Sequence, residues 1–321
     1  MENEVKVMQT ERGGAFSAAG GEAAAAKLPR RAAHKRKKFR PSRIPIYAIL
    51  IFWTLFLALP VYTLLVSSIT PLEEASASTF TWFPEHPTLQ PYADIFIHDP
   101  NLSKIGMPTL VYGFLNTMWI TLLPVVVGLI VSGLSAYAYS KLDFPGRKII
   151  FKIAFAVSMV PLGAFSVISY LFYDMLGWTN SALPLVIPGL FGSMNTVFFL
   201  KMYYETVPNE ILEAARIDGK GTFGVFFSML LPLAIPAFIA QFIFGFVGGY
   251  NSYMNPLLYL PQDDASTWTL QLALSKIVEI FPNDVNIRCA SMVLGMVPLV
   301  VLYCFCQKLF IEGISVGGVK G

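Results

Sequence analysis

The chain is poor in charged residues. Only 13% of its 321 residues are Asp, Glu, Lys or Arg, whereas a soluble domain carries about a quarter. The 20 acidic and 23 basic residues are also clustered, which leaves long stretches with almost none. Together with 55% hydrophobic residues and a mean hydropathy of +0.59, this shortage excludes an ordinary soluble fold and predicts an integral membrane protein.

Cysteine and histidine are scarce as well, with three of each. Cys289, Cys304 and Cys306 fall in one hydrophobic stretch, and residues two apart on a helix face different ways, so neither a disulfide nor a zinc site is expected. The histidines have no metal-ligand spacing, and no nucleophile is paired with a base. The segment DGKGT lacks the first glycine of a phosphate-binding loop. We therefore expect no catalytic residue, no metal and no cofactor bound by this chain.

What the sequence does contain is long apolar windows. Each of six windows has about the length that the hydrocarbon core of a bilayer requires. The fourth is interrupted by Pro184, Pro188 and two glycines, which leaves open whether it forms a complete helix. We expect an all-α membrane protein with six transmembrane helices, in which a basic, disordered tail (1–44) precedes the membrane domain (45–321). The six windows are 45–69, 111–140, 149–173, 183–202, 227–250 and 287–311.

The basic residues predict the orientation of these helices. Twenty of the 23 Lys and Arg residues lie on one predicted side of the membrane, and only Lys104, Lys276 and Arg288 lie on the other. Short cytoplasmic loops carry the excess of Lys and Arg in membrane proteins. Both termini and the loop at 204–228 are therefore expected in the cytoplasm, and the loop at 71–108 is expected outside.

The cytoplasmic loop includes the stretch PNEILEAARIDG (208–219), which has helix signals of its own. Pro208 suits the first turn of a helix, Glu210 and Glu213 lie near the positive end of the helix dipole, and Gly219 is a typical stop. This predicts a short helix between the fourth and fifth spans. Its spacing alone is equally compatible with a surface helix that packs only on its own chain. The residues predicted to share one face of this helix are Ile211, Ala214, Ala215 and Asp218.

This loop resembles that of the membrane subunits of binding-protein-dependent ABC importers. Their motif is EAA, three residues, G, nine residues, I, one residue, LP. It is matched here from Glu213 to Pro232, with Met229 in place of the isoleucine. In that family the loop forms a coupling helix that docks in a cleft of the ATPase subunit. By this resemblance the ATPase-contacting residues are Glu213, Ala214, Ala215, Asp218 and Gly219.

Further stretches resemble the MalG type of sugar permease, among them SSITPLEEA (67–75), SAYAYSKLDFPGRK (135–148) and QKLFIEGISVGGVKG (307–321). The resemblance covers 45–321. It implies a permease subunit of an ATP-driven sugar importer, with an oligosaccharide as substrate, in the plasma membrane of a prokaryote. It also implies a homologous second permease, two ATPase subunits that bind ATP and Mg, and an extracytoplasmic sugar-binding protein. By the same resemblance the segment 317–321 touches the ATPases, although a free disordered tail is equally compatible with its sequence, and no nucleic-acid partner is expected.

The substrate path is expected among polar residues at membrane depth, because such residues are costly unless they face protein or a watery cavity. The stretch GYNSYMNPLLYLP (249–261) resembles a Trp-Asn element of the sugar permeases and combines amides with aromatic rings, as sugar recognition requires. Interhelical hydrogen bonds and an interfacial aromatic belt are the structural alternatives. The path candidates are Asn251, Tyr253, Asn255 and Tyr250, followed by Asn116, Ser158, Ser166, Ser169, Asn195 and Gln241.

Other functions remain open at this stage. Within the importer family, the substrate can be another solute, such as a polyol or glycerol phosphate. A phosphorylated substrate favours basic residues along the path, and the windows are nearly free of them. A secondary transporter requires charged residues in its spans for ion coupling, often with inverted repeats, and the sequence shows neither an acidic residue deep in any window nor a clear repeat.

Overall fold

The computed structural model describes residues 44–76 and 82–318, of which 308–318 are described by their backbone only, as are Leu162 and Ala164. Nearly all of the predicted tail (1–44) and part of the segment 317–321 therefore lie outside the described residues. The described residues form helices and no strand. The chain divides into two units after Thr54, and the arrangement described below is that of the unit that begins at Leu55.

Four helical segments are long and apolar enough to cross a membrane. They correspond to the first, second, fourth and sixth predicted windows. A fifth segment counts if the helices at 222–233 and 235–250, which are bent by 80° at Ala234, form one span. The structure therefore confirms an all-helical protein with four or five candidate spans. The four segments are α1 (Ile44–Ser68), α5 (Thr109–Lys141), Leu183–Glu205 with α8 (Leu183–Leu190) and α9 (Met194–Glu205), and Val285–Gln307 within α16 (Val285–Gly318).

The third predicted window is divided into two shorter helices. These are α6 (Arg147–Ser158) and α7 (Ser166–Met175), and a short 3-10 helix, Leu162–Phe165, lies between them. Pro161 stands at the break, where its missing N–H and its ring prevent the helix from continuing. Neither helix is long enough to cross a bilayer alone, so a count of six spans is not confirmed and stays a prediction.

The fourth window is also interrupted, between α8 and α9. Gly192 has a φ of +80°, and a Cβ there would lie 2.3 Å from Ser132 Oγ and 2.7 Å from the carbonyl oxygen of Gly128. Only glycine fits such a close approach to α5. Ser193 then restarts the helix, because its Oγ accepts a hydrogen bond from the Thr196 backbone N–H at 3.2 Å while its own N–H donates to Ser132 Oγ at 3.1 Å.

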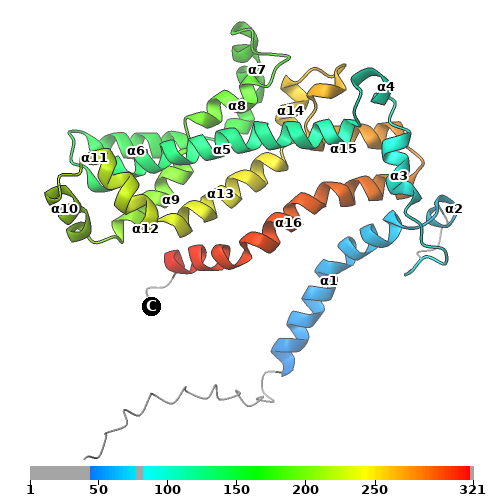
Figure 1. Ribbon diagram of the computed structural model, residues 1–321, viewed down its shortest axis with the longest axis horizontal. Helices are drawn as coiled ribbons and strands as arrows, with labels where there is room; N and C mark the ends of the chain where they lie inside the picture. The colour runs from blue at the N-terminus through cyan, green and yellow to red at the C-terminus, as the bar shows by residue number, and fades with distance from the viewer. Residues whose placement is uncertain (1–43, 77–81, 319–321) are drawn as a thin grey trace, which may run out of the picture. The chain divides into compact units, whose positions relative to one another are not determined.

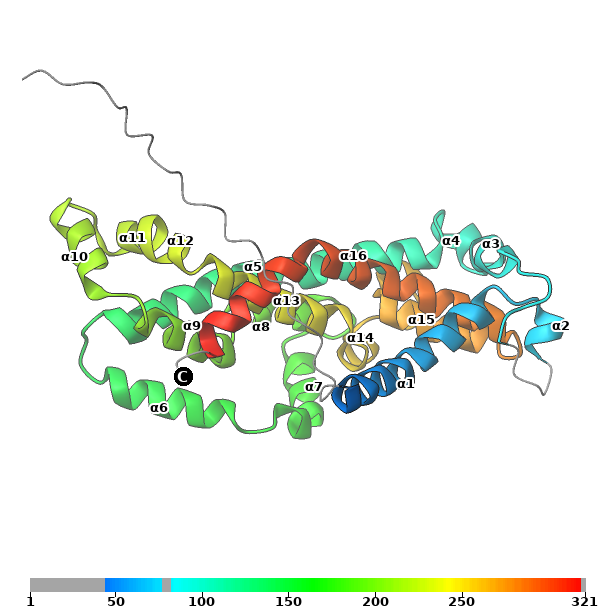
Figure 2. The same ribbon diagram turned by 90° about the horizontal axis from the view of Figure 1, so that it is seen from below.

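Helix α5 is the central element of this unit. It contacts α8, α9, α13 (Ile235–Tyr250) and α15 (Leu270–Ile280), as Figures 1 and 2 show from two directions. Close packing through small residues is typical of membrane helices. A Cβ at Gly249 of α13, for example, would lie 2.6 Å from Thr121 of α5. The sequence analysis did not predict α15, a helix between the last two windows.

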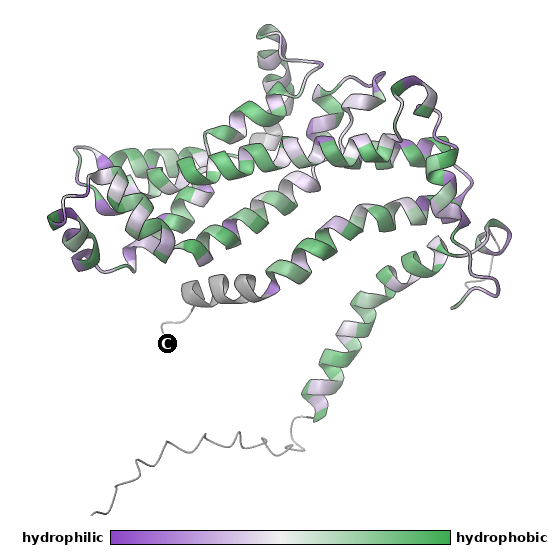
Figure 3. Ribbon diagram, in the orientation of Figure 1, coloured by the Kyte–Doolittle hydropathy of each residue, from purple (hydrophilic) through white to green (hydrophobic). Residues whose placement is uncertain are grey.

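The loop helix α10 (Asn209–Ile217) lies at one end of this unit, beside α11 (Thr222–Val225). The helices α2 (Leu72–Ala75), α3 (Gln90–Ile97) and α4 (Leu102–Ile105) lie at the opposite end (Figures 1 and 2). The long helices are mostly apolar, whereas α10 combines hydrophilic and hydrophobic residues (Figure 3). The elements that carry the basic residues of the predicted cytoplasmic loops therefore lie at the α10 end, away from the predicted external loop.

Candidate functional site

The loop helix α10 has a defined start and stop. Pro208 precedes its first helical residue, with backbone angles of −58° and 138°, so it is the N-cap rather than part of the first turn. At the other end, Gly219 has a φ of +84°. The Lys220 N–H donates to the Ala215 carbonyl at 3.1 Å, and the Gly219 N–H donates to the Arg216 carbonyl at 3.0 Å. These two bonds form a Schellman motif, which fixes the C-terminal end of α10.

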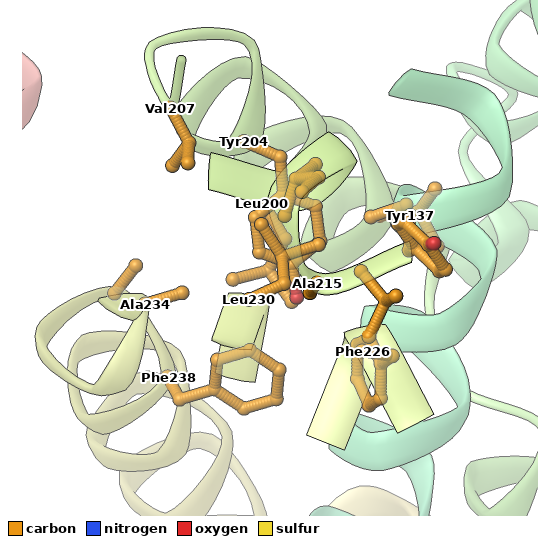
Figure 4. Packing of buried hydrophobic residues seen from close by; sticks show 14 residues of the cluster. Tyr137, Leu200, Tyr204, Val207, Ala215, Phe226, Leu230, Ala234 and Phe238 are labelled. Carbon is orange, nitrogen blue, oxygen red and sulfur yellow. The ribbon is translucent and has the colours of Figure 1, made fainter. Parts of the chain in front are cut away.

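The buried face of α10 consists of Leu212 and Ala215, which belong to a cluster of apolar residues from α5, α9 and the segment after α11 (Figure 4). Leu230, near the far end of the EAA motif, is fully buried in the same cluster. The two ends of the motif therefore pack together, which accounts for their fixed spacing. The prediction that Ala215 shares a face with Ala214 is wrong, because packing of Leu212 turns Ala215 inward and leaves Ala214 outside.

The outer face of α10 is exposed and partly apolar. Ile217 is 86% exposed and Ile211 is 38% exposed, and Ala214 is exposed between them. Three acidic residues, Glu210, Glu213 and Asp218, also lie in this region of the helix and are exposed. Contiguous exposed apolar side chains with a polar rim are typical of an interaction site. We refer to Ile211, Ala214 and Ile217 as the outer face of α10.

Lys141 connects α10 to the central helix. Its Nζ donates to the Val207 carbonyl oxygen at 2.7 Å and to Asn209 Oδ1 at 2.8 Å. Lys141 is the last residue of α5, and Val207 and Asn209 flank the N-cap of α10. The start of α10 is therefore tied to the end of α5 by a charged hydrogen-bond donor, which is stronger than a neutral one.

A cavity of about 490 Å³, lined by both apolar and polar residues, lies farther along α5. Its walls come from α5, α8, the start of α9, α13 and α14 (Met254–Tyr259), together with Thr269 before α15. Its volume lies within the range of small-molecule sites. The described residues that line it include no charged and no aromatic side chain. The polar lining residues are Thr121, Ser132, Ser193, Thr196, Gln241, Ser252, Asn255 and Thr269.

Thr269 is held in this cavity wall by two residues of α5. Asn116 Nδ2 donates to the Trp268 carbonyl at 3.0 Å, and Thr117 Oγ1 accepts a hydrogen bond from the Leu270 N–H at 2.8 Å. The residues on both sides of Thr269 are thereby fixed to α5. Thr269 itself is only 4% exposed, and its Oγ1 has no hydrogen-bond partner within the described part of the chain.

The comparisons with known proteins decide the family. Residues 125–315, more than half of the chain, match the family described as binding-protein-dependent transport system inner membrane component. The chain belongs to this family. It is 30% identical to the arabinooligosaccharides transport system permease AraQ of Halalkalibacterium halodurans, over 86% of this chain and 94% of that protein. It is 28% identical to the polygalacturonan/rhamnogalacturonan transport system permease YtcP of Bacillus subtilis, over 86% and 97%.

The fold of this permease agrees with that assignment. A crystal structure of a bacterial ABC transporter involved in the import of the acidic polysaccharide alginate contains a chain that matches with a TM-score of 0.73 and 21% identity. The match covers 85% of this chain and 99% of that one. The permease is a multi-pass component of the bacterial inner membrane, in an ABC transport system that also uses a binding protein and an ATPase.

Of the four main path candidates in the permease, only Asn255 lines the cavity. Tyr250 is fully buried, and its hydroxyl donates to the Gly295 carbonyl at 2.8 Å, so it connects α13 to α16. Asn251 Nδ2 donates to the Val247 carbonyl at 3.0 Å, one turn back in α13. Tyr253 is exposed but does not line the cavity. The structure therefore does not bring these four residues together around the cavity, because the chain turns between α13 and α14, and a role of Asn251, Tyr253 and Tyr250 in the path stays a prediction.

The secondary path candidates are divided in the same way. Gln241 lines the cavity. Asn116 has a structural role, since it holds the backbone at 266–268, and Ser158 Oγ donates to the Phe155 carbonyl in its own helix. Thr121 and Thr269 were not predicted from the sequence to line the path. A threonine in or beside an apolar window is common, and only the fold brings these two together.

An aromatic group lies beside the cavity but outside its lining. Tyr259 of α14 stacks on Tyr170 and contacts Tyr173 edge to face, with ring centroids 6.1 and 5.5 Å apart. Burial, with the neighbouring Tyr173 and Tyr170 contributing, raises the pKa of the Tyr259 hydroxyl above its usual value. The hydroxyl therefore stays neutral near pH 7.

Proposed function

We propose that this permease is a membrane subunit of an ATP-driven oligosaccharide importer. In this proposal the outer face of α10 docks on the ATPase, and the cavity beside α5 forms part of the translocation path. The saccharide names of the relatives and the hydroxyl and amide side chains in the cavity support the substrate class. Glu213, Ala214, Asp218 and Gly219 keep their proposed role at the ATPase contact, whereas buried Ala215 supports it from beneath.

The proposed assembly has six transmembrane helices, with α6 and α7 together forming the third, and with both termini and α10 in the cytoplasm. The permease pairs with a homologous second permease and with two ATPase subunits, which hold ATP and Mg. A sugar-binding protein docks at the end that carries α2, α3 and α4. Large exposed apolar surfaces on α1, α6 and α7 support this assembly, because they require lipid or another helix to cover them.

The mechanism follows from how α10 is attached. Closure of the ATPases on ATP displaces the outer face of α10. Because α10 is fixed by its Schellman motif, its buried cluster and Lys141, the displacement passes to α5, α9 and the segment that leads into α13. These elements also form the cavity walls, so movement at α10 changes access to the cavity. Packed elements respond to such displacements as rigid bodies.

One observation carries this proposal: an isoleucine, Ile217, is 86% exposed on a rigidly capped helix outside the apolar spans. We therefore propose to replace it by aspartate, purify the tagged permease from native membranes in mild detergent, and identify the co-purified subunits by mass. The wild type is expected to retain an ATPase and a second permease. The Ile217→Asp variant is expected to lose the ATPase and to keep the second permease, because a carboxylate does not enter an apolar cleft.

Met175→Asp is the matched control, since Met175 is an equally exposed apolar residue (85%) on α7. It is expected to retain both partners. An Ile217→Asp variant that still binds the ATPase as the wild type does contradicts docking by the outer face of α10. A wild-type complex without any ATPase contradicts the importer assembly itself.

The alternatives are less well supported. Family membership excludes a secondary transporter. Glycerol phosphate needs basic side chains, and the cavity lining offers none among the described residues. A polyol remains compatible with the cavity, but the names of the relatives cited above favour a saccharide.

A further inference from the structure

We infer that this subunit itself contacts the transported sugar, and that its cavity accepts neutral saccharides and disfavours acidic ones. The inference rests on the proposed function. It goes beyond family membership, because the similar proteins include transporters for neutral arabinooligosaccharides and for acidic alginate or polygalacturonan. The relatives therefore do not indicate whether the substrate is neutral or acidic, and the inference about its charge rests on the residues that line the cavity.

The hydroxyl of Thr269 is buried and has no hydrogen-bond partner among the described residues. Thr269 stands at the N-cap of α15, yet its side chain makes no capping hydrogen bond. Its Oγ1 has no partner in the described residues, although the backbone on either side is clamped to α5 by Asn116 and Thr117. A buried hydroxyl without a partner is destabilising. Oγ1 is closed off from the cavity in this structure, so a ligand hydroxyl supplies the missing bond only when the wall at Thr269 is displaced.

Two amide side chains on the other walls of the cavity are available to a ligand. Gln241 of α13 and Asn255 of α14 both line it, and neither makes a side-chain hydrogen bond to the described part of the chain. Each amide offers two donors and one acceptor with two lone pairs. Thr121, which is 3% exposed on α5, adds another hydroxyl to the lining. Neutral donors and acceptors on three helices match the hydroxyl pattern of a sugar.

The charge of the lining bears on the kind of sugar. Among the described residues, the lining contains no Lys, Arg or His to balance a carboxylate, and no Asp or Glu. Moving an ionised carboxylate into a low-dielectric site without a cation costs far more than moving a neutral hydroxyl. A uronate is therefore disfavoured at this wall. The lining also lacks aromatic rings, so stacking on a sugar face is left to residues outside this cavity.

A competing explanation is that a helix of the second permease fills the cavity. Gly245, Gly248 and Gly249 line it, and small residues on one face are typical of helix–helix contacts. Gly248 separates the two explanations, because a Cβ at this position meets no atom within 4 Å. A larger side chain at 248 therefore enters the cavity without disturbing the packing of this subunit.

The first experiment introduces Gly248→Leu into the full complex. Transport is expected to fall by at least about tenfold, while the second permease and the ATPase still co-purify. The control is Val247→Leu, because Val247 lines a different groove between α13 and α16, and it is expected to transport as the wild type does. If Gly248→Leu loses the second permease while Val247→Leu keeps it, the cavity is a subunit interface and the inference fails.

The second experiment measures ligand charge directly. A Gly248→Cys complex, with Cys289, Cys304 and Cys306 replaced by serine, is labelled with N-ethylmaleimide. Labelling is compared with arabinotriose, maltotriose, galactotriose or trigalacturonate present, and wild-type uptake of the four sugars is measured in parallel. A neutral trisaccharide that is imported is expected to slow labelling, and trigalacturonate is not. Adding Thr269→Val, which removes the unpaired hydroxyl, is expected to weaken the protection.

The outcomes separate this inference from the proposed function. Protection by trigalacturonate alone overturns the neutral selectivity. An imported sugar that gives no protection shows that recognition lies on another subunit. A wild-type complex that imports none of the four saccharides contradicts the proposed substrate class instead, and the inference falls with it.

Discussion

At the scale of single residues, Gly219 is required for its backbone conformation and not for lack of space. Its φ of +84° lies in the left-handed region, and nothing lies within 4 Å of a Cβ built there. Gly219→Ala is therefore expected to lower stability by about 1 kcal/mol through backbone strain alone. Because the Schellman motif orients the end of α10, ATPase activity stimulated by the binding protein is expected to fall as well.

Gly221→Ala is the matched control for this prediction. Gly221 also has open space around its Cβ position, but its φ is −68°, which alanine adopts without strain. This variant is expected to be as stable as the wild type or slightly more so. Thermal unfolding of the two purified complexes tests the pair, and an equal loss of stability in both contradicts the assignment of the stop to Gly219.

Single residues also show where the sequence stops being informative. The stop at Gly219 follows from local chemistry, and the structure confirms it. The inward position of Ala215 and the burial of Tyr250 do not, because each depends on a partner distant in sequence: the cluster around Leu230 for Ala215 and the Gly295 carbonyl for Tyr250. Spacing along one helix gives relative positions on that helix and not the direction of the core.

At the scale of elements, Lys141 connects α5 to α10. Lys141→Met keeps the length and apolar stem of the side chain but removes both hydrogen bonds to residues 207 and 209. We expect ATP hydrolysis to persist while transport per ATP falls about tenfold, since the energy that couples two sites corresponds to factors of that order. Lys141→Arg, which keeps the charge, is expected to restore part of the coupling.

The readout is the ratio of sugar transported to ATP hydrolysed in proteoliposomes. Lys148→Met is the control, because Lys148 is an exposed lysine on α6 whose side chain makes no hydrogen bond to the described residues of α10. If hydrolysis and transport fall in parallel in Lys141→Met, the lysine only supports folding or assembly. If the ratio of sugar transported to ATP hydrolysed is unchanged in Lys141→Met, the apolar cluster around Leu212 and Ala215 transmits the displacement of α10 without the lysine.

The bounds of a helix were predictable from the sequence where a continuous apolar stretch alone determines them. The first and second windows coincide with α1 and α5 to within two residues at each end, whereas the sixth begins two residues after α16 and ends seven residues before it. The third, fourth and fifth windows contain breaks at Pro161, Gly192 and Ala234 that tertiary packing defines. Helix α15 was missed because it is short and amphipathic, with a polar face that resembles a loop in composition.

At the scale of the whole molecule, the open question is how many times the chain crosses the membrane. If α6 and α7 together form a span, Met175 at the end of α7 faces the outside together with Lys104 of α4, and Lys148 of α6 faces the cytoplasm. Cysteines introduced singly at these three positions, in a background without native cysteine, report this through a membrane-impermeant thiol reagent. All three sites lie near helix ends.

In intact spheroplasts we expect labelling of Lys104→Cys and Met175→Cys, and labelling of Lys148→Cys only after the membrane is opened. This pattern follows from the excess of Lys and Arg on one predicted side. Labelling of Met175→Cys only after opening means that α6 and α7 return to the side they came from, which leaves fewer than six spans. Labelling of Lys148→Cys in intact spheroplasts would mean that the orientation is the reverse of the predicted one. Helix α10 would then lie on the side opposite the ATPase, so this result would also contradict the coupling proposal.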